Sequence, residues 1–228
     1  MKSNFLNQNE RLDDLQYNNL QIIQNKNLYC FSSDAVLLCN FVKAKPTDCI
    51  LDLCSGSGVV GILAQAKTNA KSLVMIEKQT ELYDMCCRSI LLNNLQDKAT
   101  VLNMDIKNAP QHFENKKFDV ICCNPPYYLT TDKKLSGNKC KDMAKFEIDF
   151  SFDLLCSVVS KLLKYGGKFY MVNDSSRIAE LLATLKKYQL EPKIIEFCFP
   201  KSDKDSNVVL LQSTKNGRSG AKIYYKNI

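Results

Sequence analysis

The stretch CILDLCSGSGVVGILAQA (49–66) decides the fold class of this chain. Its first six residues, 49–54, have the apolar composition of a buried strand. A glycine-rich turn follows, and the run at 58–66 has the length and composition of a helix. A buried strand that leads through glycines into a helix is typical of the first unit of a nucleotide-binding α/β fold.

Strand-like and helix-like segments alternate along the rest of the chain. Short apolar runs predict further strands at 72–77, 99–104, 118–123 and 168–173. Apolar residues at helical spacing predict further helices at 80–95, 152–164 and 175–188. The runs 193–200 and 207–213 flank a turn and predict an antiparallel hairpin. The sequence therefore predicts a Rossmann-like α/β fold, in which a mostly parallel seven-stranded sheet ends in this hairpin and carries helices on both faces.

The composition is that of a soluble globular protein with a basic surface. The chain is 45% hydrophobic and 24% charged, and its formal net charge of +7 favours a polyanionic partner such as a nucleic acid. No stretch has the length of a membrane span, and the first residues lack the apolar segment of a secretory signal. We therefore expect a cytoplasmic protein with no membrane contact.

The eleven cysteines do not have the spacing of a metal site. No C-x-x-C pair occurs, and His112 is the only histidine, so a Cys/His zinc cluster has few candidate ligands. So many thiols indicate a reducing compartment, in which cysteine packs as a small hydrophobe. We expect no bound metal, and a monomer rather than an oligomer.

The turn Gly56-Ser57-Gly58-Val59-Val60-Gly61 matches G-x-G-x-x-G, a pattern that both NAD enzymes and S-adenosylmethionine enzymes use. Acids at three successive strand ends favour S-adenosylmethionine. Asp52 can engage the ammonium of its amino-acid moiety, Glu77 both ribose hydroxyls, and Asp105 the adenine amine. The predicted cofactor site comprises Asp52, Cys54, Gly56, Gly58, Glu77, Asp105 and Ile106. The alternative is that these acids only cap strand ends.

The motif Asn124-Pro125-Pro126-Tyr127 points to chemistry at a planar NH₂ group. The lone pair of such an amine is delocalised, so catalysis needs acceptors that hold both N–H groups and aim the lone pair. The Asn124 side-chain oxygen and the Pro125 carbonyl can serve as these two acceptors, and the two prolines stiffen the loop that carries them. Tyr127 offers a face on which a flipped base can stack. We predict all four residues as catalytic, with Asn124 also beside the cofactor; a rigid turn with a packed tyrosine is the alternative.

The residues 52–58 and 124–127 together resemble the class I methyltransferases that act on nitrogen. The segments ERLDDLQYNNLQIIQNKNLYCFSSDAVLLCNFV (10–42) and LEPKIIEFCFP (190–200) resemble, more narrowly, the bacterial tRNA1(Val) (adenine(37)-N6)-methyltransferase family, and the resemblance covers nearly the whole chain.

This resemblance implies transfer of a methyl group from S-adenosylmethionine to N6 of adenine 37 in a valine tRNA. It implies an N-terminal extension (1–45) that packs over the cofactor site of a methyltransferase domain (46–228). It also implies that the segment from Phe31 to Leu38 packs over the methionine end of the cofactor, with Asp34 nearby.

One segment departs from that family, and two others fit an RNA partner. Residues 144–147 read Ala-Lys-Phe-Glu where Ala-Arg-His-Glu would be expected, and lysine lacks the bidentate fork of arginine. The loop 127–147 carries five lysines against three acids, and the tail 215–228 carries four basic residues and no acidic side chain. Tyr224 and Tyr225 lie among the tail charges and can stack on unpaired bases; a solvated, frayed tail is the alternative.

Other functions use parts of the same pattern. A protein-glutamine methyltransferase acting on a release factor would use the NPPY motif on an amide NH₂, although such enzymes usually carry a larger helical domain before the glycine turn. A DNA adenine methyltransferase would need a target-recognition domain. A catalytically silent RNA-binding module would not need the acids or the motif, and a nicotinamide dehydrogenase would leave the motif unexplained.

Overall fold

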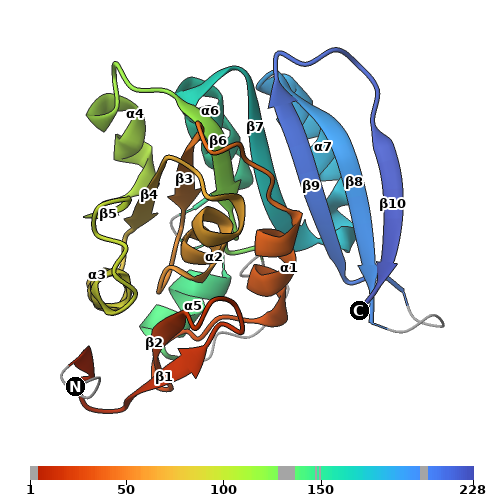
Figure 1. Cartoon of the computed structure of the whole chain (residues 1–228). Helices are drawn as coiled ribbons and strands as arrows, with labels where there is room; N and C mark the ends of the chain where they lie inside the picture. The colour runs from red at the N-terminus through yellow and green to blue at the C-terminus, as the bar shows by residue number, and fades with distance from the viewer. Residues whose placement is uncertain (1–4, 128–136, 147, 149, 201–204) are drawn as a thin grey trace.

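The computed structural model describes residues 5–127, 137–146, 148, 150–200 and 205–228, and strands and helices alternate along it (Figure 1). The strands are β1 (Glu10–Asp14), β2 (Gln21–Asn25), β3 (Cys49–Leu53), β4 (Ser72–Glu77), β5 (Ala99–Asn103), β6 (Phe118–Cys123), β7 (Leu163–Asp174), β8 (Leu190–Phe199), β9 (Val208–Lys215) and β10 (Lys222–Asn227). The α-helices are α1 (Ser33–Phe41), α2 (Val59–Thr68), α3 (Thr80–Leu92), α4 (Ala109–His112), α5 (Lys139–Lys145), α6 (Phe152–Leu162) and α7 (Ile178–Lys187). Single 3₁₀ turns precede α4 and α7, at η2 (Ile106–Asn108) and η3 (Ser175–Arg177).

Eight of the described strands form one sheet in the order β10-β8-β9-β7-β6-β3-β4-β5. The strands from β7 to β5 are parallel, and β9 is antiparallel to both β7 and β8. This confirms the mostly parallel sheet and its C-terminal hairpin. The sheet has one strand more than the seven predicted, because residues 222–227 of the basic tail pair in parallel with β8 as strand β10.

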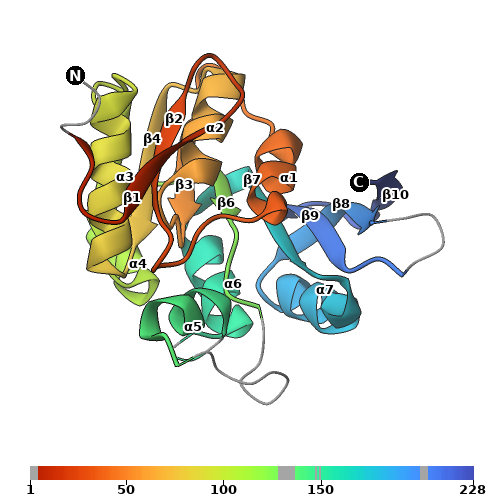
Figure 2. The ribbon, with the colours of Figure 1, turned by 90° about the horizontal axis from the view of Figure 1, so that it is seen from below.

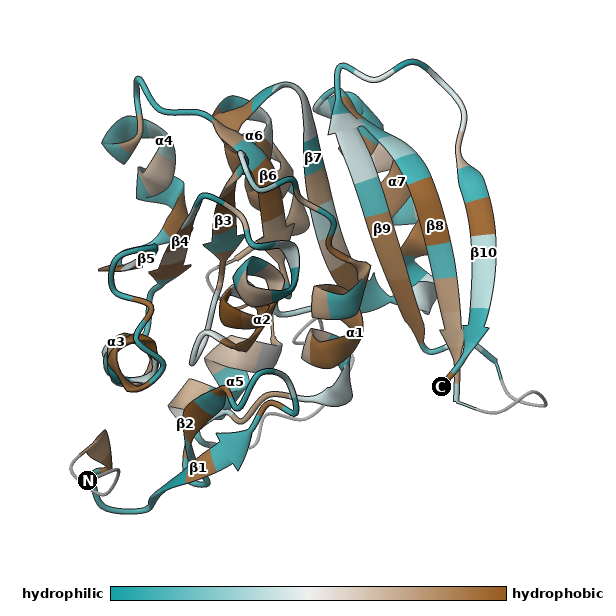
Figure 3. Ribbon diagram, viewed as in Figure 1, coloured by the Kyte–Doolittle hydropathy of each residue, from teal (hydrophilic) through white to brown (hydrophobic). Residues whose placement is uncertain are grey.

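Helices cover both faces of the sheet, as the view from below shows (Figure 2). α1, α2 and α3 pack on one face, with Leu38 and Ile62 in the core beneath them. α4, α6 and α7 pack on the other face, over a core that includes Leu155 and Phe169. The central strands are coloured as mostly hydrophobic in Figure 3, which is typical of parallel strands buried on both sides.

The N-terminal segment is anchored to α3 by hydrogen bonds and an ion pair. β1 and β2 form a separate antiparallel hairpin. The Ile23 N–H donates to Ser89 Oγ over 3.1 Å, and the Gln21 N–H donates to Asn93 Oδ1 over 2.9 Å. Arg88 Nη1 lies 2.6 Å from Glu10 Oε2. The hairpin therefore leads the chain along α3 and into α1, at the edge where the parallel strands end.

Candidate functional site

The candidate site lies where the carboxyl ends of β3, β4, β5 and β6 meet at one edge of the sheet. Ligands of open α/β sheets bind at this edge, because the loops that follow parallel strands converge there. The loops supply the glycine turn after β3, Glu77 at the end of β4, Asp105 after β5 and Asn124 after β6. The sequence analysis predicted these residues for the site. All four loops contribute residues to the wall of one cavity.

The glycine turn brings backbone N–H groups and the start of α2 to this edge. Gly56 and Gly58 have φ values of +56° and +98°, in the left-handed region that glycine adopts without strain. A Cβ atom at Gly58 would lie 2.6 Å from Cys86 Sγ, so the close packing of the turn on α3 also requires glycine there. The turn therefore cannot accept a larger residue at position 58 without moving α3.

Glu77 forms part of the cavity wall and is held by the turn opposite. Its carboxylate accepts hydrogen bonds from the backbone N–H groups of Gly56 and Gln79, each over 2.8 Å. The residue is 6% exposed, and burial raises its pKa although these hydrogen bonds act in the opposite direction. The carboxylate is thus fixed in orientation at the cavity wall, where it can accept further hydrogen bonds from a ligand.

Asp105 follows the neighbouring strand β5, lines the same cavity and caps the short turn η2. Its carboxylate accepts from the Lys107 N–H over 3.1 Å and pairs with Lys78 Nζ at 3.1 Å. Partial burial acts to raise its pKa, but these two contacts outweigh burial and lower it. The cavity therefore has a carboxylate that stays ionised at neutral pH, beside the apolar side chain of Ile106.

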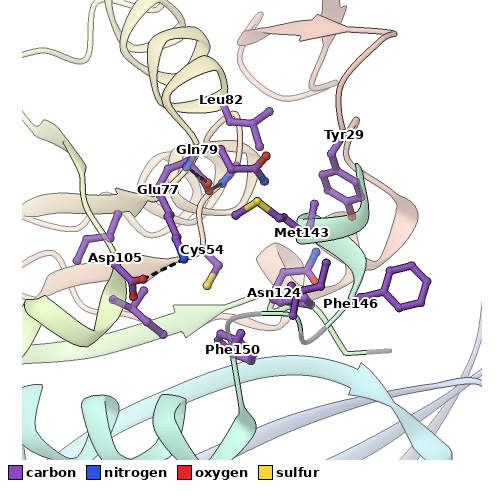
Figure 4. A pocket seen from close by; sticks show the side chains of 17 residues that line it. Tyr29, Cys54, Glu77, Gln79, Leu82, Asp105, Asn124, Met143, Phe146 and Phe150 are labelled. Atoms are coloured by element: carbon purple, nitrogen blue, oxygen red, sulfur yellow. Dashed lines mark hydrogen bonds and ion pairs between the residues drawn. The ribbon is translucent and has the colours of Figure 1, made fainter. Parts of the chain in front are cut away.

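Apolar and aromatic side chains such as Leu82, Phe146 and Phe150 form much of the remaining cavity wall (Figure 4). The lining residues that the sequence prediction included are Cys54, Gly56, Glu77, Asp105, Ile106, Asn124 and Pro126. Those that it did not include for the cofactor site are Tyr29, Ile76, Lys78, Gln79, Leu82, Met143, Ala144, Phe146, Ile148 and Phe150. Two fixed carboxylates in such a cavity suit a ligand that has a flat apolar part and several hydroxyl or amine groups.

Four predicted cofactor residues, Phe31, Asp34, Asp52 and Gly58, do not line this cavity. Asp52 is 1% exposed beneath the turn, where it accepts from the Gly61 N–H over 2.9 Å and contacts Cys122 Sγ at 3.5 Å. Burial raises the pKa of Asp52 to about 7. The Asp52 carboxylate thus holds the first turn of α2, and its predicted contact with the cofactor ammonium stays a prediction.

Phe31 is linked to the glycine turn through Gln24. The Phe31 N–H donates to Gln24 Oε1 over 3.1 Å, and Gln24 Nε2 lies 2.5 Å from Ser57 Oγ. Gln24 is fully buried, so this link between β2, the start of α1 and the glycine turn is shielded from water. The N-terminal segment therefore reaches the site, and its Tyr29 forms part of the cavity wall.

The NPPY motif lies at the junction of this cavity with a second one. Asn124 and Pro126 line the first cavity, and Pro125 and Tyr127 line the second. Tyr29 and Ala144 line both, so the two cavities adjoin. Successive residues of the motif therefore line the two cavities alternately.

Tyr127 is held from two sides. Its hydroxyl donates to Asp34 Oδ2 over 2.5 Å, and its carbonyl accepts from Arg177 Nη1 over 2.9 Å. Asp34, predicted near the cofactor, lines the second cavity, beside the tyrosine. The ring of Tyr127 therefore has a fixed place in the wall of the second cavity.

The segment that departs from the expected family pattern also forms part of the site. Phe146, which stands where histidine would be expected, is 4% exposed and lines the first cavity. Glu147 and residues 128–136 of the predicted RNA-contacting loop lie outside the described residues. His112 lies on α4, where its ring meets that of Phe113 edge-on, away from the residues that line the two cavities.

Metal-binding clusters and membrane-spanning helices are absent from the described part of the chain. Within it, no group of three or more histidine, cysteine or acidic residues is arranged to hold a metal ion. All eleven cysteines are unbridged. None of the described helices combines the length and the apolar character needed to cross a membrane.

Comparison with protein families matches residues 20–189 to the methyltransferase small domain. A tRNA1(Val) (adenine(37)-N6)-methyltransferase from Shewanella halifaxensis is 26% identical over 159 residues, which cover 70% of this chain and 63% of that protein. A release factor glutamine methyltransferase from Clostridium botulinum is 28% identical over 162 residues, which cover 69% of this chain and 55% of that protein. The chain thus spans less than two thirds of the length of these relatives.

Solved structures share the fold. A predicted O-methyltransferase from Agrobacterium tumefaciens superposes with a TM-score of 0.67 at 20% identity and covers 86% of each chain. TYW2 from P. horikoshii, in complex with MeSAdo, superposes with a TM-score of 0.65 at 15% identity and covers 92% of this chain and 73% of its own. Identities this low show the likeness of the fold alone.

Proposed function

Because the chain belongs to the methyltransferase small domain family, we propose that it transfers a methyl group from S-adenosylmethionine to the N6 amine of adenine in tRNA, at adenine 37 of a valine tRNA. The observation that carries this proposal is the NPPY motif at the junction of two cavities, one with fixed carboxylates and one with Tyr127. Tight positioning of an amine beside a methyl donor is the chemistry that such a junction supports.

The first cavity fits the proposed methyl donor. Glu77 would accept from the ribose hydroxyls, Asp105 would accept from the adenine amine, and Phe146 and Phe150 offer apolar surface to the adenine ring. When bound, S-adenosylmethionine supplies an electrophilic methyl group on its sulfonium sulfur. Asn124, the first residue of the NPPY motif, lines this cavity and would lie between the methyl donor and the amine that accepts the methyl group.

The NPPY residues would hold the amine of the target base. The Asn124 side-chain oxygen and the Pro125 carbonyl accept its two N–H groups, so that the nitrogen lone pair points toward the donor cavity. The base stacks on Tyr127, a contact worth roughly 1–3 kcal/mol. The hydrogen bonds from Tyr127 to Asp34 and from Arg177 to the Tyr127 carbonyl keep that ring in place before the base arrives. The methylated nitrogen is acidic, so no strong general base is needed.

Relatives and charge support tRNA as the acceptor. Two proteins named tRNA1(Val) (adenine(37)-N6)-methyltransferase align with this chain. The one from Shewanella halifaxensis covers 70% of the chain, and the one from Shewanella pealeana covers 80%. The net charge of +7 favours a polyanionic substrate. We also propose the division into an N-terminal extension (1–45), which supplies Tyr29 and Asp34, and a methyltransferase domain (46–228). The monomeric state and the cytoplasmic location stay predictions.

The second candidate is methylation of a glutamine side chain in a release factor. It is favoured by the similarity to the release factor glutamine methyltransferase of Clostridium botulinum, and a side-chain amide offers the same planar NH₂ group. A glutamine, however, has no aromatic ring to stack on Tyr127. A catalytically silent RNA-binding module is the third candidate, and it gives no reason for two oriented carboxylates in the first cavity.

Parallel methyl transfer to three acceptors tests the proposal. The protein is incubated with methyl-labelled S-adenosylmethionine and, separately, unmodified total tRNA, a purified release factor and duplex DNA. We expect label in tRNA alone. Label in the release factor would move the assignment to glutamine, and donor binding without label in any acceptor would favour the silent module.

A further inference from the structure

We propose that a groove between α1 and the edge strand β10 binds RNA phosphates and an unpaired base beside the target nucleotide. This inference rests on the proposed function, because it assigns the RNA a path on the protein surface. The groove is lined by α1, by Lys43 just after it, by Tyr170 of β7, and by side chains of β8 and β10.

The strand β10 presents two different faces. Its parallel register with β8 pairs Lys222 with Ile194, Tyr224 with Glu196 and Lys226 with Cys198. Alternate side chains of a strand lie on the same face, so these three β10 residues share one side of the sheet. Tyr224 and Lys226 line the groove together with their neighbours Ile194 and Glu196 on β8, which identifies that side.

The opposite face of β10 carries Ile223 and Tyr225. Tyr225 is 82% exposed, whereas Tyr224 is 44% exposed because it lines the groove wall. The two adjacent tyrosines of the tail therefore belong to different surfaces. Of these two tyrosines, Tyr224 is the one that faces the groove and can stack on a base there.

The groove begins close to the NPPY motif. Asp34, the hydrogen-bond partner of Tyr127, is in the first turn of α1, whereas Leu37 and Phe41 of the same helix line the groove. At 1.5 Å per residue, these two positions lie about 5 and 10 Å along the helix axis from Asp34.

The far wall of the groove lies within electrostatic range of a thiol that the same aspartate also influences. Burial raises the pKa of Cys198 on β8 to about 11, and the charges of Glu196, Lys226 and Asp34 all act on this thiol. Lys226, on β10, and Asp34, on α1, therefore both lie within electrostatic range of the Cys198 thiol. RNA that enters the second cavity at Tyr127 would meet the groove directly beside it.

The charges of the groove favour a polyanion. Among the lining residues, Lys43 and Lys226 stand against one acid, Glu196, and Lys222 lies on the same face of β10 as Lys226. All three lysines are exposed, and within the described part of the chain no ion pair with a carboxylate engages them. Lysines spaced along a groove with an aromatic side chain between them are the usual arrangement for single-stranded nucleic acid.

Tyr224 lies between the two β10 lysines in sequence. The spacing Lys-x-Tyr-x-Lys places a stacking surface between two cations on one face of the strand, at intervals of about 7 Å. Backbone phosphates of an extended strand lie at similar intervals, so both lysines can contact the RNA that stacks on Tyr224. The anticodon loop is the part of a tRNA that offers unpaired bases next to the proposed target.

Measurements of tRNA affinity with β10 variants test this assignment. Lys222→Ala/Lys226→Ala removes two groove charges, and Lys71→Ala/Lys161→Ala removes two exposed charges before β4 and on α6. Dissociation constants for unmodified tRNA are measured by fluorescence anisotropy over a range of salt concentrations. The groove variant should bind about 10-fold more weakly or worse, and its salt slope should fall by about 1.4, as expected for two lost contacts to single-stranded phosphates. The control variant should keep the wild-type values.

Tyr224→Ala and Tyr225→Ala form the second matched pair. We expect Tyr224→Ala to weaken tRNA binding about 5-fold or more, as loss of one stacked base predicts, and Tyr225→Ala to leave it unchanged. S-adenosylmethionine affinity and thermal unfolding of each variant check that the fold is intact. Equal effects of the two tyrosine variants would overturn the assignment of the groove as an RNA site. They would point instead to the outer face or the open edge of β10, where another protein could dock. Equal effects of the two lysine variants would overturn the assignment as well.

The same data separate this inference from the proposed function. If wild-type protein binds tRNA through the groove but transfers no methyl group to it, the proposed function fails and the groove stands. If the wild-type protein methylates tRNA and the groove variants keep its affinity and KM, the groove fails and the proposed function stands.

Discussion

The hydroxyl of Tyr127 donates a 2.5 Å hydrogen bond to Asp34 Oδ2, across 93 residues of sequence. The bond connects the NPPY motif to the first turn of α1, which the N-terminal hairpin places at the edge of the sheet. Because Arg177 also holds the Tyr127 carbonyl, the ring is fixed at both ends. In the proposed reaction, Asp34 is a positioning residue that acts through Tyr127.

Loss of the Asp34–Tyr127 bond should reduce methylation without affecting the donor. We expect Asp34→Ala and Tyr127→Phe each to lower kcat/KM for tRNA about 5- to 10-fold, which corresponds to one hydrogen bond of about 1 kcal/mol. The double variant should be no worse than the single variants, because both remove the same contact. Steady-state kinetics on all four proteins measures this coupling, and additive losses would contradict it.

Removal of the Asn124 side chain should separate chemistry from donor binding. We expect Asn124→Ala to lower the single-turnover rate at least ~100-fold, since it removes an acceptor needed to orient the amine. Calorimetric titration should find nearly wild-type affinity for S-adenosylmethionine. Loss of donor affinity in this variant would place Asn124 in the cofactor site rather than at the amine.

Glu77 should contribute mainly to donor affinity. We expect Glu77→Gln to weaken S-adenosylmethionine binding roughly 10-fold or more, as for loss of a charged hydrogen-bond acceptor. Glu81→Gln, on the exposed side of α3, is the matched control and should bind the donor as the wild type does. Titration calorimetry compares the three proteins. An unchanged S-adenosylmethionine affinity of the Glu77→Gln variant would show that Glu77 does not bind the donor.

The buried Asp52 should make stability depend on pH. Its pKa is raised to about 7 by burial, whereas an aspartate in an unfolded chain titrates near ~4. The folded state therefore binds this proton more tightly, and the stabilisation is fully present below pH ~4 and is lost as the pH rises through about 7. Relative to Asp52→Asn, the wild-type free energy of unfolding should fall by on the order of 4 kcal/mol across this range. Urea unfolding at a series of pH values tests this, and parallel profiles of the two proteins would contradict it.

The sequence predicted the strands β3 to β9, the helices α2, α3, α6 and α7, and the residues that directly follow a strand, but not β1, β2, α1, α4, α5 or β10. The predicted limits of β4 and β6 were confirmed residue for residue, because apolar runs that end at Glu77 and Asn124 leave little choice of boundary. Both residues line the first cavity, since parallel strands bring their carboxyl ends to one edge.

Side-chain direction and long-range contacts were harder to predict. Asp52 belongs to the same set of strand-end acids, but alternation along β3 points it toward α2 with Ile50, beneath the turn rather than into the cavity. Tyr29 and Phe146 reach the cavity from segments without a periodic pattern, so no local signal marks them. The strand β10 depends on pairing with β8, which the basic composition of the tail does not indicate.

The most direct test of the central claim is nucleoside analysis of labelled tRNA from the wild-type and Asn124→Ala proteins. Unmodified total tRNA is incubated with methyl-labelled S-adenosylmethionine, hydrolysed to nucleosides and separated by chromatography. We expect all wild-type label to elute as N6-methyladenosine and none to appear with Asn124→Ala. Label in another methylated nucleoside, or label that survives loss of the Asn124 side chain, would contradict the claim that the NPPY motif orients an adenine amine.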